Sequence, residues 1–199
     1  MALRYVFHVS DLHIRNGDVK LCRYQEYNDV FDRLFASAKS KICEMDLTRD
    51  EYVFVVSGDI FHNKNTIGNY GLMLYKKFLK NLTHIGRTIV FHGNHDRNQN
   101  EVDQPSLVSS TMEIENLILL DKTTVFSIDD VEFSYVSIDD TLDSYSTCGR
   151  IDDLPAFPRI SQAGNKNIKH KIAMFHGTFA NVKLYNGIEV SDEHKPYPF

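Results

Sequence analysis

Three short apolar runs, each followed by a loop that carries acidic or histidine side chains, constrain this chain more than any other feature. The runs cover residues 5–9, 52–56 and 88–91. Apolar residues at helical spacing between the runs predict helices over 24–45 and 69–82. Continuous apolar runs of this kind are typical of strands buried on both faces of a sheet. The alternation predicts an α/β fold in which the three following loops meet at one edge of a sheet.

The second half of the chain predicts more strands than helices. Further strands are expected at 117–120, 124–128, 131–136 and 172–175. Asp129-Asp130 fits a tight turn between two of them, and 104–112 fits a short helix. Residues 139–169 show no periodicity. The last apolar run leads directly to His176-Gly177, which repeats the pattern of a strand followed by a candidate ligand.

Length and composition indicate one ordinary globular domain spanning residues 1–199. Of these 199 residues, 42% are hydrophobic and 25% are charged. The three cysteines form no Cys-x-x-Cys pair, which argues against a disulfide framework or a thiolate zinc site. No apolar run approaches the roughly 20 residues that cross a bilayer. The N-terminus also lacks a signal sequence, so we expect an intracellular protein without membrane attachment.

The first two strand ends supply a mixed set of oxygen and nitrogen ligands. Asp11 and His13 are separated by one residue, so in an extended segment both side chains lie on the same face. Gly58-Asp59 adds a second carboxylate, whose two oxygens could bridge two ions. A carboxylate–imidazole set suits Mn²⁺, Fe or Zn²⁺ better than Ca²⁺. Each pattern alone is also compatible with an ordinary loop aspartate or a Gly-Asp turn.

The segment Gly93-Asn94-His95-Asp96 and the later His176 complete the candidate site. Asn94 offers a neutral oxygen ligand, and His95 is suited to stabilise or protonate a phosphate group. We expect Asp96 to orient the His95 ring by a hydrogen bond. His176 adds an imidazole ligand at another strand end. The whole set predicts two ions about 4 Å apart, bridged by Asp59, that activate a water for in-line attack at phosphorus.

These motifs, in this order, resemble the calcineurin-like metallophosphoesterase superfamily over residues 4–96 and again at His176-Gly177. Ser/Thr protein phosphatases have Asp-Arg-Gly after the second motif and a glutamate after Gly-Asn-His, whereas this chain has Ile60-Phe61-His62 and Asp96. The segment from Gly58 to His62 and the helix before it are instead similar to SbcD/Mre-type nucleases of DNA double-strand-break repair.

That resemblance implies a layered α/β/β/α fold of mixed sheets flanked by helices, and two Mn²⁺ ions (or Mg²⁺, Fe or Zn²⁺). It implies that Asp11, His13 and Asp59 bind one ion, and that Asp59, Asn94 and His176 bind the other. His95 would be the phosphate-facing acid, and His62 a further catalytic histidine that helps to position a DNA end. The implied partners are DNA, an SbcC-type coiled-coil ATPase and a second copy of the chain, and the implied activity is exonuclease and endonuclease cleavage.

One feature of the family is missing from the sequence. The family closes its site with a Gly-His-x-His loop that gives one further histidine to each metal, but here His194 is followed by Lys195-Pro196. We therefore expect a fold that is incomplete at its C-terminal end, and weakened metal binding and activity. Two other functions stay open. The net charge of −5 favours a small-molecule or nucleotide phosphodiesterase, and the missing histidines favour a binding module without activity.

Overall fold

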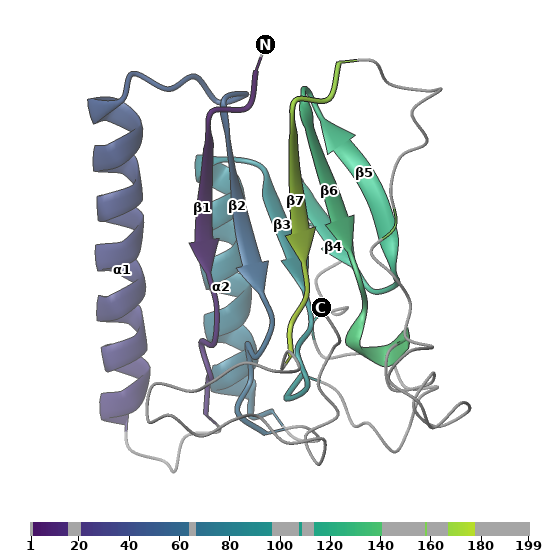
Figure 1. The fold of residues 1–199 in the computed structure, drawn as a ribbon. Helices are drawn as coiled ribbons and strands as arrows, with labels where there is room; N and C mark the ends of the chain where they lie inside the picture. Colours follow the sequence, from purple (N-terminus) through teal and green to yellow (C-terminus); the bar gives the residue numbers. More distant parts are fainter. Residues whose placement is uncertain are drawn as a thin grey trace, which may run out of the picture. The chain divides into compact units, whose positions relative to one another are not determined.

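The chain forms two compact units, each built around its own sheet (Figure 1). The computed structural model describes residues 2–15, 21–63, 67–96, 108, 114–140, 158 and 167–177. The first unit spans Met1–Leu120 and the second spans Asp121–Phe199.

The first unit alternates strands and helices as the sequence predicts. Its elements are β1 (Tyr5–Val9), α1 (Leu21–Glu44), β2 (Tyr52–Ser57), α2 (Asn69–Ile85), β3 (Thr88–Phe91) and β4 (Leu117–Leu120). All neighbouring strands are parallel, in the order β1-β2-β3-β4. The last paired residues, Val9 with Val56 and Ser57 with Phe91, lie at the same edge of the sheet. The loops after β1, β2 and β3 therefore leave from that edge, as expected.

The second unit has a mixed sheet in the order β5-β6-β7. Its strands are β5 (Thr124–Ile128), β6 (Val131–Tyr135) and β7 (His170–Met174). β5 and β6 form an antiparallel hairpin, whereas β6 and β7 are parallel. The hairpin turns at Asp129-Asp130, where Asp129 adopts a positive φ of 51°. The turn predicted at these two residues is therefore confirmed. Aspartate suits this position because it tolerates the left-handed region better than most residues.

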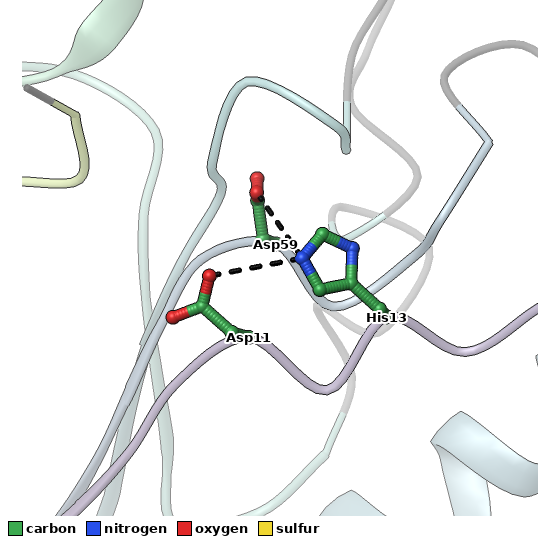
Figure 2. A group of neighbouring side chains, drawn as sticks. All are labelled: Asp11, His13 and Asp59. Carbon is green, nitrogen blue, oxygen red and sulfur yellow. Dashed lines mark ion pairs between the residues drawn. The ribbon is translucent and has the colours of Figure 1, made fainter. Parts of the chain in front are cut away.

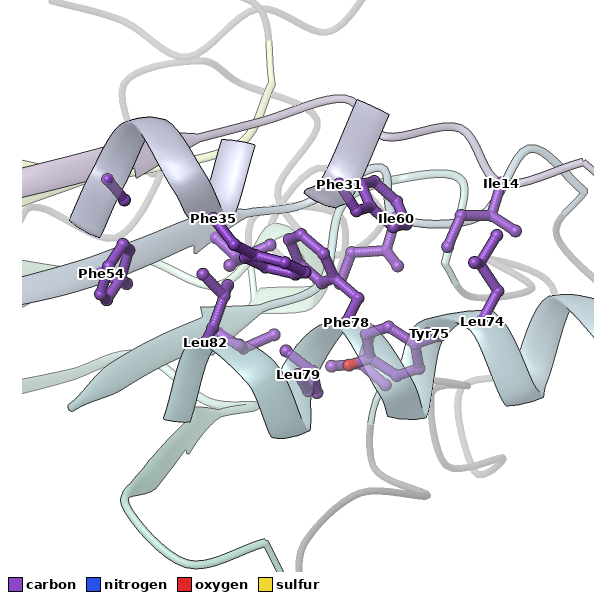
Figure 3. Close-up of a cluster of buried hydrophobic side chains, with 14 of the residues drawn as sticks. Ile14, Phe31, Phe35, Phe54, Ile60, Leu74, Tyr75, Phe78, Leu79 and Leu82 are labelled. Atoms are coloured by element: carbon purple, nitrogen blue, oxygen red, sulfur yellow. The ribbon is translucent and has the colours of Figure 1, made fainter. Parts of the chain in front are cut away.

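Aromatic and aliphatic side chains from both helices, the strands and the loops form the core of the first unit. Figure 3 shows Phe31 and Phe35 of α1 close to Phe78 of α2, and Phe54 of β2 belongs to the same cluster. The ring centroids of Phe31 and Phe78 are 4.5 Å apart. Every residue of β2 is buried, which confirms the prediction of a strand covered on both faces. This core holds α1 and α2 in fixed positions relative to the strand ends.

The predicted α/β class is confirmed, with a parallel sheet, a mixed sheet and flanking helices. Element bounds differ by a few residues. α1 begins at Leu21 instead of residue 24, and α2 continues to Ile85, where Gly86 ends it with an extended backbone. β7 ends at Met174, one residue earlier than expected. Except for Val108, the helix predicted at 104–112 lies outside the described residues.

Candidate metal centre

The loops after β1 and β2 run side by side, joined by main-chain hydrogen bonds. The N–H groups of Asp11 and His13 donate to the carbonyl oxygens of Gly58 and Asp59, at 3.2 and 2.9 Å. Ile14 extends this pairing with an isolated parallel bridge. The backbone itself therefore places two ligand candidates from the first loop beside one from the second, although they lie more than 45 residues apart in the sequence.

Asp11, His13 and Asp59 form a cluster whose ligand atoms all lie within 4.8 Å of one another. Figure 2 shows the His13 ring facing both carboxylates. Its Nε2 is 3.7 Å from Asp11 Oδ1 and 3.7 Å from Asp59 Oδ2. Side-chain exposure falls from 56% at Asp11 to 34% at His13 and 7% at Asp59. The cluster thus opens to solvent on the Asp11 side and is closed around Asp59.

The backbone of this cluster has an uncommon conformation. Asp11, His13 and Asp59 all have positive φ angles, of 57°, 43° and 49°, and Gly58 before Asp59 has a φ of 75°. Each left-handed residue other than glycine costs about 1–3 kcal/mol unless surrounding contacts hold it, and such residues concentrate at functional sites. Three of them within one ligand cluster indicate a local backbone arranged for binding rather than for stability.

The donor set fits a divalent transition-metal ion. Two ligand atoms bound to the same ion at roughly 2.1 Å lie about 3.0–3.5 Å apart. The observed 3.7 Å is therefore too long for a hydrogen bond and close to the spacing of shared ligands. The buried Nδ1 of His13 has no hydrogen-bond partner among the described residues. A carboxylate–imidazole–carboxylate set suits Mn²⁺, Fe or Zn²⁺.

Asp96 joins the loop after β3 to the loop after β2. Its buried carboxylate accepts hydrogen bonds from the N–H groups of Phe61 and Gly93, both at 2.8 Å. Burial is the main cause that raises the pKa of Asp96, and the N–H donors oppose this shift. The predicted bond from Asp96 to the His95 ring is a wrong assignment, because both carboxylate oxygens face the main chain instead.

The His95 ring is oriented by the main chain of the neighbouring loop. Its Nδ1 lies 2.9 Å from the carbonyl oxygen of His62. A carbonyl only accepts, so Nδ1 carries the proton and Nε2 is left as the nitrogen that can exchange one. The main-chain N–H of His95 also donates to Asp59 Oδ1 at 3.0 Å, which connects His95 directly to the ligand cluster.

Three imidazole rings gather beside the carboxylates. The ring centroid of His13 is 5.6 Å from that of His62 and 5.1 Å from that of His95. The rings of His62 and His95 are nearly parallel, at 6.1 Å. Burial first, and then the positive charge of Arg15, lower the pKa of His62. The rings therefore form a group in which neutral imidazole is favoured at His62.

Asn94 and His176 complete the set of residues singled out from the sequence. Asn94 is half-buried and directly precedes His95, whose N–H contacts Asp59. His176 is half-buried and follows β7, and it belongs to the second unit. The structure thus brings together Asp11, His13, Asp59, His62, His95 and Asp96 within the first unit. That Asn94 and His176 bind a second ion stays a prediction.

Ser10 is a polar residue of the site that the motifs do not single out. Its hydroxyl donates to Asp11 Oδ2 and lies 3.3 Å from the carbonyl oxygen of Ser57. This contact fixes the exposed carboxylate of the cluster. The only signal in the sequence is that a serine directly precedes Asp11, and serine next to aspartate is too common in loops to identify a role.

Nearly the whole chain matches the model of a known protein family. The model of the calcineurin-like phosphoesterases matches residues 5–197, a range that includes the ligand cluster and both units. The chain therefore belongs to the calcineurin-like phosphoesterases, a family of metal-dependent enzymes that hydrolyse phosphoesters.

One relative has a much longer chain. The uncharacterized protein R555 of Acanthamoeba polyphaga mimivirus is 30% identical over 199 residues, which cover 96% of this chain and 13% of the viral protein. The similarity thus concerns a small part of that relative. Among the described residues, no helix is long and apolar enough to cross a membrane.

Proposed function

We propose that this chain is the nuclease domain of an SbcD/Mre-type enzyme that hydrolyses phosphodiester bonds at DNA ends during double-strand-break repair or recombination. Its class, metal-dependent phosphoester hydrolysis, follows from the family. The observation that carries the finer assignment is the position of His62. This residue ends the segment from Gly58 that resembles these nucleases, and its ring lies beside the rings of His13 and His95.

Asp11, His13 and Asp59 are the proposed ligands of the first ion, and Asp59, Asn94 and His176 those of the second. Mn²⁺ is the proposed metal, since mixed carboxylate and imidazole sets favour such ions over Ca²⁺. When bound, the two ions would supply a water nucleophile and neutralise charge on the phosphate. The neutral amide of Asn94 adds an oxygen ligand without adding a negative charge that repels the substrate.

His95 is the proposed proton donor to the leaving oxygen. Its Nδ1 is held by the carbonyl oxygen of His62, so a proton on Nε2 is the one that can be transferred. The hydrogen bond from its main-chain N–H to Asp59 holds the residue, and with it the ring, beside the ligands. His62 contributes in two ways, because its carbonyl orients His95 while its ring is available to position a DNA end.

The partners are part of the same proposal. Resemblance to SbcD/Mre-type nucleases supports DNA, an SbcC-type coiled-coil ATPase and a second copy of the chain as partners, and an intracellular location. Val30, Tyr70 and Met73 are large hydrophobic residues of α1 and α2 that remain exposed, which supports contact with another chain.

Incubation of the protein with Mn²⁺ and a linear DNA duplex tests the proposal. We expect cleavage that is lost in His95→Ala and Asn94→Ala and retained in His84→Ala, a control on the exposed side of α2. Loss of a proton donor typically lowers the rate by roughly 10²–10⁴-fold. Unchanged cleavage in both site variants would contradict the proposal and point to a contaminating nuclease.

A small-molecule phosphodiesterase is the second candidate, favoured by the net charge of −5. An enzyme of that kind would hydrolyse a bis-aryl phosphodiester in the presence of Mn²⁺ and leave both linear and nicked DNA intact. A binding module without activity is the third candidate. It predicts no Mn²⁺ binding at millimolar concentrations in calorimetry, whereas both enzymes require such binding.

A further inference from the structure

The hydroxyl of Tyr27 on α1 is hydrogen-bonded to the main chain on both sides of Ile14. It donates to the carbonyl oxygen of His13 at 2.7 Å and accepts from the N–H of Arg15 at 3.3 Å. A single side-chain atom therefore satisfies two main-chain groups of the loop that carries His13. The two groups lie on the same edge of that short segment, because Ile14 between them directs its own N–H and C=O to the opposite edge, and successive residues of an extended segment alternate in this way.

The opposite edge of the same segment pairs with the loop after β2. The Ile14 N–H donates to the carbonyl oxygen of Ile60 at 2.8 Å, and the His62 N–H donates to the carbonyl oxygen of Ile14 at 3.0 Å. Among the described residues, the segment has a strand partner on this side only. On the other side the Tyr27 hydroxyl takes the place that a third strand would have, and it does so next to a candidate metal ligand.

Tyr27 is itself anchored to the core of the first unit. Its ring packs against that of Phe31 with centroids 6.0 Å apart, and the Phe31 ring lies 4.5 Å from that of Phe78. Phe31 is 4% exposed. The packing of α1 on α2 therefore fixes the position of the Tyr27 hydroxyl. The hydrogen bond from this hydroxyl in turn holds the main chain of His13.

His13 needs such support because its backbone is strained. A φ of 43° costs about 1–3 kcal/mol in a residue other than glycine and persists only where neighbouring contacts hold it. Without the hydroxyl, the 13–15 segment keeps its bonds to the loop after β2 but loses both bonds on the other edge. The segment can then relax toward ordinary φ angles, which moves the His13 ring away from the two carboxylates.

We propose that Tyr27 is a positioning residue for metal binding: its hydroxyl holds His13 in the left-handed conformation that directs the imidazole toward Asp11 and Asp59. The inference rests on the metal site of the proposed function and is independent of the substrate. It assigns a role to a helix residue that is 14 positions away from the ligand it orients.

The test compares Tyr27→Phe with Tyr24→Phe by calorimetric titration with Mn²⁺. Both substitutions remove one hydroxyl from a half-buried tyrosine of α1, but the Tyr24 ring packs against Tyr70 instead of the ligand loop. Partners that orient metal ligands typically contribute 10- to 100-fold to affinity. We therefore expect Mn²⁺ affinity to fall roughly 10-fold in Tyr27→Phe and to stay unchanged in Tyr24→Phe.

Two further measurements separate positioning from a general structural role. The absorption spectrum of bound Co²⁺ should change in Tyr27→Phe alone, because the imidazole ligand is displaced. In a double-mutant cycle with His13→Ala, removal of the hydroxyl should cost less affinity than it does when His13 is present. A purely structural role predicts additive losses and an unaltered spectrum.

The outcomes distinguish this inference from the metal site on which it rests. If the unsubstituted protein and Tyr27→Phe bind Mn²⁺ with equal affinity, the inference is overturned and the metal site stands. No Mn²⁺ binding by the unsubstituted protein would overturn the site and the inference together. Equal losses in Tyr27→Phe and Tyr24→Phe would also overturn it, because they would reflect loosening of α1 as a whole.

Discussion

Asp59 contacts two histidines of the candidate site, His13 and His95. It is 5% exposed, one carboxylate oxygen faces His13, and the other accepts the N–H of His95. A buried carboxylate needs compensating partners, since desolvation of a charge is costly. Here the His95 main-chain N–H and a bound ion would both stabilise the negative charge of the Asp59 carboxylate. The carboxylate therefore contributes to the local fold and to the proposed binding of an ion.

Asp59→Asn should weaken Mn²⁺ binding by more than the roughly 10- to 100-fold typical of residues that only orient ligands. The amide keeps an oxygen for the His95 N–H but removes the negative charge and the bridging oxygen pair. Calorimetry would measure the affinity, and Asp32→Asn, at an exposed position of α1, is the control. Equal affinities of the two variants would contradict the assignment of Asp59 as a ligand.

His62 gives a prediction about pH in the metal-free protein. Burial lowers its pKa below 6.5, so the unfolded chain takes up the proton first as pH falls. The contribution of neutral His62 to stability is therefore full above pH 6.5 and is lost as pH falls toward the folded pKa. NMR titration should show this ring titrating below 6.5, and His62→Gln should reduce the loss of stability at acidic pH, whereas His84→Gln should not. A His62 pKa at or above that value would refute the prediction.

At the scale of elements, the packing of α2 against α1 contributes to the stability of the first unit. Phe78 contacts both Phe31 and Phe35 and is fully buried. Phe78→Ala should lower the free energy of unfolding by about 3–5 kcal/mol, because it removes a large buried side chain and leaves a cavity. Met73→Ala on the same helix is the control, since that side chain is 58% exposed and should change stability by less than about 0.5 kcal/mol. Denaturant titration of the two variants measures the difference, and similar stabilities would contradict the packing of α2.

The hydrogen bonds by which Asp96 joins two loops lead to a second prediction at this scale. Asp96→Ala leaves the N–H groups of Phe61 and Gly93 without their acceptor, and each unpaired buried donor costs about 1–3 kcal/mol. Removing a buried carboxylate also relieves its desolvation, so the net loss should lie at the lower end of the sum. Thermal or denaturant unfolding would measure it against Asp32→Ala. Equal stabilities would show that the two loops are held together without Asp96.

At the scale of the whole molecule, the number of ions bound tests the proposed role of His176. We expect two Mn²⁺ ions to bind to the unsubstituted protein and one to bind to His176→Ala. His170→Ala, an exposed histidine at the start of β7, is the matched control and should retain both ions. Two ions bound to His176→Ala with unchanged affinity would exclude His176 as a ligand.

Most elements of the fold follow from the sequence because they depend on local patterns. The apolar runs of β1, β3, β4 and β5 have the predicted bounds, and both predicted helices are present. Periodicity of apolar residues reports which face of an element is buried, and it needs no knowledge of distant contacts. Element ends are less certain, since α2 continues three residues beyond its apolar stripe. The end of a helix depends on how its last main-chain groups are paired.

The sequence by itself determined the ligand-bearing strand ends, because a buried strand that ends in Asp, Asn or His is visible as a local pattern. Only the tertiary structure decided which groups these residues meet. Asp96 holds two main-chain N–H groups instead of the His95 ring, the His62 carbonyl orients His95, and Tyr27 supports His13. Except for that of Asp96 with Gly93, these contacts join residues 14 to 35 positions apart in the sequence. They form because the main chain of each buried loop must find partners, and the partners available depend on how the elements pack.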